Sequence, residues 1–295
     1  MEAIPHADQL LGFYGPDSMM WRINREAVLL GAGPTALLLQ IAHPSVARGV
    51  GEHSDFEGDP FKRLHGTIHT TMALVFGDAR SAERAVRKLN GIHARVRGEG
   101  YRALDPKLLL WVQVTLIVTS VRAYERWVGS LGQHEKDQFW HEARSVGIRL
   151  GIPLQLSPPS WAELMAYWDR MLAADGPIQV TDTARRLAPM IVRPPLPLVP
   201  GALVDLLALP GMALLPPRLR EDFGIGWSDR HERTARLIGL AIRLWVGVVP
   251  ARLRSLPQAN RARKRVRRWR PPPRHDRPGR GTPPCGRPMA DRSVR

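Results

Sequence analysis

A histidine on an otherwise apolar helix face is the clearest candidate for chemistry in this 295-residue chain. His93 shares one face with Val86 and Leu89 of a predicted helix over residues 81–97, because these positions are spaced by three and four residues. An imidazole placed there is either a neutral core histidine bonded to a carbonyl group or a ligand to a metal or to non-thiolate haem iron. Both interpretations of His93 stay open at this point.

The preceding predicted helix, over residues 63–76, places polar side chains along the edge of its own apolar face. Arg63 and Thr67 are four residues apart and border the same edge. The planar guanidinium of Arg63 could pair with a carboxylate or a haem propionate, or equally with the chain's own Asp59 or Glu57. Thr67 could donate a hydrogen bond to a bound ligand.

Other familiar site classes fit the sequence poorly. Residues 31–36 match the GxGxxA dinucleotide fingerprint, but the apolar run before them is short and no alternation of strands and helices follows. His65 and His69 lack the glutamate of an HExxH zinc motif, and no glutamate is followed by histidine three residues later, as a di-iron bundle would need. Cys285 is the only cysteine, which excludes disulfides and thiolate-bound metals from residues 1–257.

The formal charge of +16 is concentrated at the C-terminal end of the chain. Residues 258–295 contain 13 Lys or Arg and two Asp, and they are also rich in proline and glycine. We therefore expect two regions, a helical domain over residues 1–257 and a disordered Arg/Pro-rich tail over residues 258–295. The tail could be an arm for nucleic acid or anionic lipid, but a solvated extension is the favoured interpretation, and nucleic acid is not an expected partner.

Periodicity of apolar residues predicts an all-α fold, a single domain of many helices for which globin-like packing is one option. Alternating strand patterns are not seen. The predicted helices cover residues 26–39, 63–76, 81–97, 106–128, 133–150, 160–173, 181–191, 202–215 and 228–248.

The sequence predicts no membrane-spanning helix. The uncharged segment over residues 108–121 is shorter than the roughly 18 to 20 residues that span a bilayer, and it is typical of a buried helix. The first nine residues contain Glu2 and Asp8, unlike a secretory signal. We expect a cytoplasmic protein and leave peripheral membrane contact open.

Three segments of this chain resemble the MpaB-like oxygenase family, which includes the latex-clearing rubber oxygenases. They are LLGAGPTALLLQIAHPSVARGVGEHSDFEGDPFKRLHGT, then NGIHARVRGEGYRALDPKLLLWVQVTLIVTSVRAYERWV, then LPPRLREDFGI, and they occur in the family's order. The resemblance implies an all-α fold and, from the rubber-cleaving members, a non-covalent haem b that uses oxygen to cleave or oxidise apolar substrates.

The resemblance also implies roles for individual residues. His93 would be the proximal haem ligand, with His43 and His53 as reserve candidates for the metal. Arg63 and Thr67 would line the haem pocket, Thr67 on the distal side.

This chain departs from the family pattern at two positions. Gly66 stands where rubber-cleaving relatives have a lysine, and because glycine cannot ligate iron, the sixth position would be open or water-filled. Gln113 stands where many members have a histidine. The expected function is a haem b-dependent oxygenase acting with O2 on an isoprenoid- or lipid-like substrate. The alternative is a catalytically silent member that binds an apolar ligand or lies at a membrane surface.

Overall fold

Helices make up nearly all of the regular structure. The computed structural model describes residues 11–53, 60–194 and 199–268, and the side chains of residues 60–65 and 67 lie outside this description. Fourteen α-helices and one β-hairpin, with two strands of two residues each, occur within these ranges. This composition confirms the predicted all-α class.

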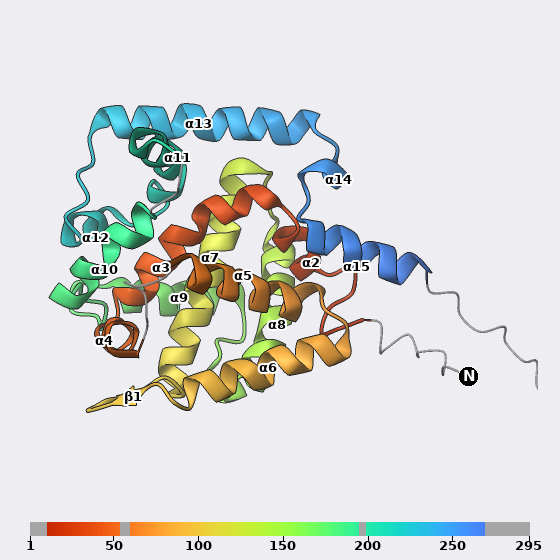
Figure 1. Cartoon of the computed structure of the whole chain (residues 1–295), viewed down its shortest axis with the longest axis horizontal. Coiled ribbons are helices and arrows are strands. Elements are labelled where there is room, and N and C mark those ends of the chain that lie inside the picture. The colour runs from red at the N-terminus through yellow and green to blue at the C-terminus, as the bar shows by residue number, and fades with distance from the viewer. Residues whose placement is uncertain (1–10, 54–59, 195–198, 269–295) are drawn as a thin grey trace, which may run out of the picture.

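The elements follow one another along the chain, coloured from red to blue in Figure 1. The N-terminal half contains α2 (Met19–Asn24), η1 (Ala27–Ala32), α3 (Gly33–Ile41), α4 (Pro44–His53), α5 (Pro60–Phe76), α6 (Ala79–His93), β1 (Arg97–Gly98), β2 (Tyr101–Arg102), α7 (Pro106–Trp127) and α8 (Gln133–Arg149). The remainder contains η2 (Leu154–Leu156), α9 (Trp161–Leu172), α10 (Asp182–Val192), α11 (Gly201–Met212), α12 (Pro217–Asp222), α13 (Asp229–Val248), α14 (Ala251–Arg254) and α15 (Pro257–Arg268).

Helix α7 runs through the middle of the molecule and organises the core (Figure 1). The fully buried ring of Trp111 stacks on Trp168 of α9 with ring centroids 5.6 Å apart, and its indole N–H donates to the Leu39 carbonyl of α3 over 3.1 Å. Among the described residues, α7 is the one unbroken helix long and apolar enough to cross a membrane, but 61% of its most apolar window is buried within the protein. We therefore assign α7 to the core, as the sequence predicted.

The helix predicted over residues 81–97 ends four residues early, at His93. The chain then forms a hairpin in which Arg97 pairs with Arg102 and Gly98 with Tyr101. Gly100 in the turn has φ +74°, a left-handed conformation that glycine adopts without steric cost. The turn therefore removes residues 94–97 from the helix and leaves His93 at its C-terminus.

The prediction that residues 258–295 form a disordered tail is wrong for its first part. Helix α15 extends to Arg268, and its Ala259 and Ala262 side chains are buried. Arg265 of α15 donates a hydrogen bond of 2.8 Å to the Phe76 carbonyl at the end of α5. Small alanines at a spacing of three let this basic helix pack closely, a tertiary contact that composition alone does not reveal. Residues 269–295, the rest of the predicted tail, lie outside the described residues.

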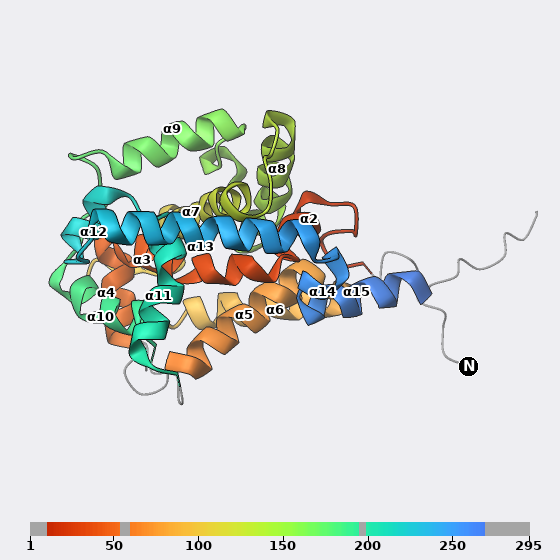
Figure 2. The ribbon, with the colours of Figure 1, turned by 90° about the horizontal axis from the view of Figure 1, so that it is seen from above.

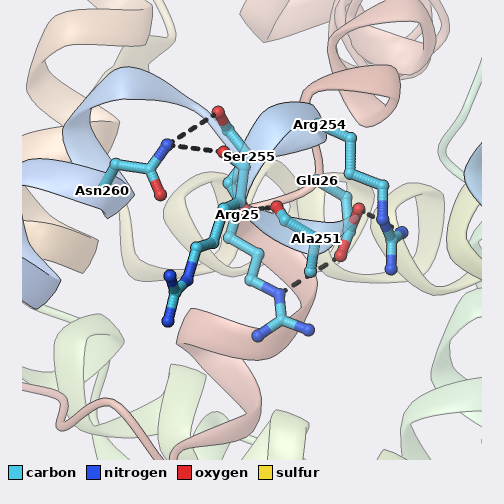
Figure 3. Close-up of polar contacts among 7 residues, drawn as sticks. Arg25, Glu26, Ala251, Arg254, Ser255 and Asn260 are labelled. Atoms are coloured by element: carbon cyan, nitrogen blue, oxygen red, sulfur yellow. Dashed lines mark hydrogen bonds and ion pairs between the residues drawn. The ribbon is translucent and has the colours of Figure 1, made fainter. Parts of the chain in front are cut away.

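A buried ion cluster fastens the N-terminal part of the chain to the C-terminal helices. The carboxylate of Glu26, only 1% exposed, accepts from Arg254 at 2.6 Å and from Arg25 at 3.2 Å (Figure 3). The backbone supports the same junction, because Glu26 forms a β-bridge with Ser255 and the Leu256 N–H donates to the Arg25 carbonyl. Segments more than 220 positions apart in sequence are therefore joined at one buried point.

Helix α11 approaches the 3-10 helix η1 so closely that a side chain would not fit between them. A Cβ added at Gly211 would lie 2.4 Å from the Gly31 carbonyl oxygen, and the Thr35 hydroxyl donates to the Gly211 carbonyl over 2.6 Å. The GxGxxA pattern thus lies in η1 and α3, at a helix–helix contact.

We expect Gly211→Ala to lower the free energy of unfolding by about 1–3 kcal/mol, because backbone atoms cannot yield as a side chain would. Urea denaturation measures this change. Gly201→Ala, in the first turn of the same helix, is the matched control, since an added Cβ there has no neighbour within 4 Å. Equal unfolding midpoints for the two variants would contradict the packing argument.

Candidate functional site

Helix α6 presents a buried face that ends in a histidine. The helix starts at the N-cap Asp78, whose carboxylate accepts from the Ser81 N–H over 2.7 Å. Ala85 and Val86 are buried on the inner face, and Leu89 packs against the core one turn later. The exposed residues of the helix include Arg84, Arg87 and Lys88. This arrangement confirms the predicted face and places His93 at its C-terminal end.

The imidazole of His93 is half-buried and lacks a hydrogen bond on one side. Its Nδ1 atom is buried and has no partner among the residues that the structure describes. Burial lowers the pKa of His93 below its ordinary value, so the ring is held neutral. The Nδ1 atom therefore gives no support to the interpretation of His93 as a core histidine bonded to a carbonyl group. A neutral imidazole with an unpartnered ring nitrogen fits the other interpretation, a ligand to a metal or to haem iron.

Helix α5 packs along α6 (Figure 1). Its inner face is formed by Ile68, which packs on the core, and by the buried Met72 and Val75, as predicted. Arg63 and Thr67 belong to the first two turns of this helix, but their side chains lie outside the described residues. Their assignment to a ligand pocket stays a prediction.

Gly66 on α5 is half-buried, and its surroundings would accept a side chain. A Cβ added at this position meets no described atom within 4 Å. The Gly66 carbonyl accepts a hydrogen bond of 2.8 Å from the Thr70 hydroxyl, one turn further along the helix. The absence of a side chain here is therefore not imposed by crowding from the described part of the protein.

The two reserve histidines have contacts within the chain. His43 lies at the 105° bend between the η1–α3 segment and α4, and its Nδ1 accepts from the Ser45 N–H over 3.2 Å. Burial lowers the pKa of His43, and the negative charge of Asp105 partly opposes this shift. His53 ends α4, is exposed, and has its Nε2 atom 3.0 Å from the Arg97 carbonyl. Both histidines thus have structural partners, while His93 keeps an unpartnered buried nitrogen, and all three assignments remain predictions.

Gln113 of α7 forms a hydrogen bond to α8. Its Nε2 donates to the Ala143 carbonyl over 2.7 Å, and a Cβ added at Gly147 would lie 2.6 Å from its Oε1. The Oε1 atom is buried with no hydrogen-bond partner among the described residues. The Gln113 amide thus fills the space between α7 and α8. Gly147 of α8 has no side chain that would occupy this space.

Asn90 is a polar residue near His93 that our sequence reasoning missed. It lies three residues before His93 on the same side of α6, and its Nδ2 donates to the Arg149 carbonyl at the end of α8 over 3.2 Å. Its Oδ1 atom, like His93 Nδ1, is buried without a partner in the described part of the chain. The three-residue spacing to His93 was the signal that could have identified it.

We expect the free energy of unfolding to fall as the pH drops below about 6.5. Burial lowers the pKa of His93 and of His43 in the folded protein, whereas the unfolded chain binds protons near the ordinary histidine pKa. The neutral rings therefore contribute stability above that pH, and the contribution is lost as the pH falls toward the folded-state pKa. Urea midpoints at about pH 7.5 and about pH 5.5 measure the loss.

His93→Gln should reduce this pH dependence, and His141→Gln, at an exposed position of α8, is the control that should leave it unchanged. A pH dependence of the same size in His93→Gln and in the unsubstituted protein would show that His93 is not held neutral by burial.

Two structural observations narrow the class of protein. The described residues form no parallel sheet, and within them no group of three or more His, Cys, Asp or Glu side chains is arranged to hold a metal ion. The described residues thus form an all-α domain with a half-buried histidine at the end of one helix.

A family model for "ER-bound oxygenase mpaB/B'/Rubber oxygenase, catalytic domain" matches residues 20–244. The chain belongs to this family.

The curated relatives that resemble the chain are themselves uncharacterized. Uncharacterized protein Mb2261 of Mycobacterium bovis and uncharacterized protein Rv2237 of Mycobacterium tuberculosis are each 29% identical to it over 230 residues. The aligned region covers 73% of this chain and 88% of each relative. No solved structure matches the chain.

Proposed function

We propose that this protein is a haem b-dependent oxygenase that acts with O2 on an apolar, isoprenoid- or lipid-like substrate. The family is one of oxygenases, which supports the reaction class. The observation that carries the cofactor assignment is His93, a neutral imidazole with a buried ring nitrogen that has no partner in the described structure. A neutral imidazole at the end of α6 is available as a ligand to iron.

Residues of α5 and α6 would divide the work of holding the cofactor. His93 would ligate the iron, and Arg63, on the neighbouring helix, would pair with a propionate through its planar fork. Haem, when bound, supplies the O2 chemistry that no side chain of this protein provides. Thr67 would donate its hydroxyl proton as a hydrogen bond to a ligand on the side away from His93. Gly66 cannot ligate, so α5 would leave that side open.

Absorbance spectroscopy of the full-length protein tests this proposal. One equivalent of hemin added to the apo-protein should produce a shifted Soret band that saturates, and dithionite should then move the band as the iron is reduced. Hemin that keeps the spectrum of the free compound at every ratio would contradict the proposal.

A second candidate function is a catalytically silent, helical binding protein for an apolar ligand. Gln113 favours it, because the position where many family members have histidine is filled here by an amide bonded to the Ala143 carbonyl across the α7–α8 contact. Glutamine cannot ligate iron as imidazole does or exchange protons near neutral pH. The same spectra separate the two candidates, since a silent apo-protein would purify colourless and take up no hemin.

A further inference from the structure

Helix α13 lies along the outer edge of the molecule (Figures 1 and 2). One of its faces is buried and the opposite face is exposed. Its inner face packs on α7 and α11 through Ala235 and Val246, which are buried. The opposite face is a stripe of exposed apolar side chains at spacings of three and four residues, namely Leu237, Leu240, Leu244 and Val248. Their exposed fractions run from 54% to 84%. We call these four side chains the α13 stripe.

Two further large apolar side chains are exposed on α13 and α14. Leu253 of α14 is 78% exposed, and the large ring of Trp245 is 46% exposed beside Leu244. Single exposed leucines are common on soluble proteins. Several of them along one helix face indicate a surface that binds another molecule when the protein functions. The question is which partner covers it.

The charge around the stripe favours an anionic partner. No Asp or Glu occurs from Arg233 to His275, whereas 13 Lys or Arg residues occur in the same interval. Arg233, Arg243 and Arg252 are exposed on α13 and α14. Glu232, at the start of α13, is already bonded to Arg236 and to the Trp227 indole N–H. Glu125 of α7, whose carbonyl accepts from Arg243 over 3.4 Å, has its carboxylate paired with Lys136. The apolar stripe is thus accompanied by exposed arginines, and the two neighbouring carboxylates, Glu232 and Glu125, already have cationic partners.

The same charges oppose the pairing of this face with a second copy of the chain. Two α13 helices packed stripe to stripe would bring their flanking arginines together, and residues 233–275 include no acidic residue to pair with them. A lipid surface has the complementary pattern, with apolar chains beneath a layer of negative phosphates. Helices that lie in that interface combine leucine and tryptophan on one side with arginine at the edges.

We propose that α13 docks the protein on an anionic lipid membrane. The α13 stripe and Leu253 enter the boundary between headgroups and acyl chains, and Trp245 lies at headgroup level. Arg233, Arg243 and Arg252 contact lipid phosphates. This proposal is independent of the cofactor, because no residue of the candidate haem site takes part in it.

Vesicle flotation with the full-length protein tests the proposal. The protein should float with vesicles of phosphatidylcholine and phosphatidylglycerol, and less with phosphatidylcholine alone. Replacing both Leu240 and Leu244 by serine should weaken binding by about 100-fold, roughly tenfold for each leucine withdrawn from the interface. Replacing both Arg233 and Arg243 by glutamine should weaken binding to the anionic vesicles by about fivefold per residue, and added salt should do the same.

The matched control replaces Leu154 and Leu156 by serine, since these leucines are similarly exposed but belong to η2 and not to α13. This control should bind like the unsubstituted protein.

Three results would overturn the proposal. One is the absence of vesicle binding at low salt, and another is equal binding by the Leu240/Leu244 variant, which would assign the contact to another basic region. The third is a dimer in light scattering that the same variant dissociates, because the stripe would then pair with a second copy.

Discussion

Replacing Glu26 by glutamine is expected to lower the free energy of unfolding by about 3–5 kcal/mol, the cost typical of breaking a buried ion pair. The carboxylate is 1% exposed and faces Arg254, itself 14% exposed, so the substitution leaves a largely buried guanidinium without its counter-charge (Figure 3). The loss should be larger than for an ordinary surface change, because the cluster joins the start of the fold to α14.

Urea denaturation of Glu26→Gln measures this effect, with Asp182→Asn as the control. Asp182 also pairs with an arginine, Arg185, but its side chain is 95% exposed, and water screens such a pair. The control should therefore unfold close to the unsubstituted protein. A Glu26→Gln protein with an unchanged midpoint would mean that the buried cluster does not hold the two chain segments together.

His93→Ala is expected to weaken hemin binding by at least about 100-fold, beyond the roughly 10- to 100-fold typical of losing a supporting hydrogen bond around a metal ligand. The reason is direct, since the substitution removes the nitrogen donor itself. The fold should survive, because His93 is the last residue of α6 and its side chain is only half-buried. Hemin titration followed at the Soret band gives the affinity.

Three further histidine variants make this prediction specific. His43→Ala and His53→Ala remove the reserve candidates, whose ring nitrogens contact Ser45 and Arg97. His141→Ala removes an exposed histidine of α8. All three should bind hemin like the unsubstituted protein. If His43→Ala or His53→Ala loses binding and His93→Ala does not, the ligand assignment moves to that histidine.

The long helices could be predicted from sequence because each carries its own boundary signals. Asp105 caps α7, and its side chain accepts from the Lys107 N–H as expected for an N-cap followed by proline. Ser160 caps α9 by accepting from the Glu163 N–H. These contacts are local, so spacing alone fixes them. The helices not predicted, α2, α4, α12, α14 and α15, are mostly short, and tertiary packing stabilises them.

The candidate site was predictable only in part, because some of its contacts are local to one helix and others join distant helices. Periodicity along one helix placed His93 on the buried face of α6, and the structure confirms that face. The partners of Gln113 and Asn90, by contrast, are backbone carbonyls of α8, and which helices cross at these points depends on the whole fold. The contact between Glu26 and Arg254 likewise joins residues that no local pattern connects.

Rescue of a cavity variant by free imidazole tests the central claim, that His93 ligates haem iron, most directly. His93→Gly should fail to give the spectrum of the hemin-loaded unsubstituted protein, and added imidazole should restore that spectrum by occupying the position of the missing ring. His141→Gly, measured with the same imidazole, controls for binding of imidazole to hemin elsewhere. A His93→Gly protein that matches the unsubstituted spectrum without imidazole would contradict the claim.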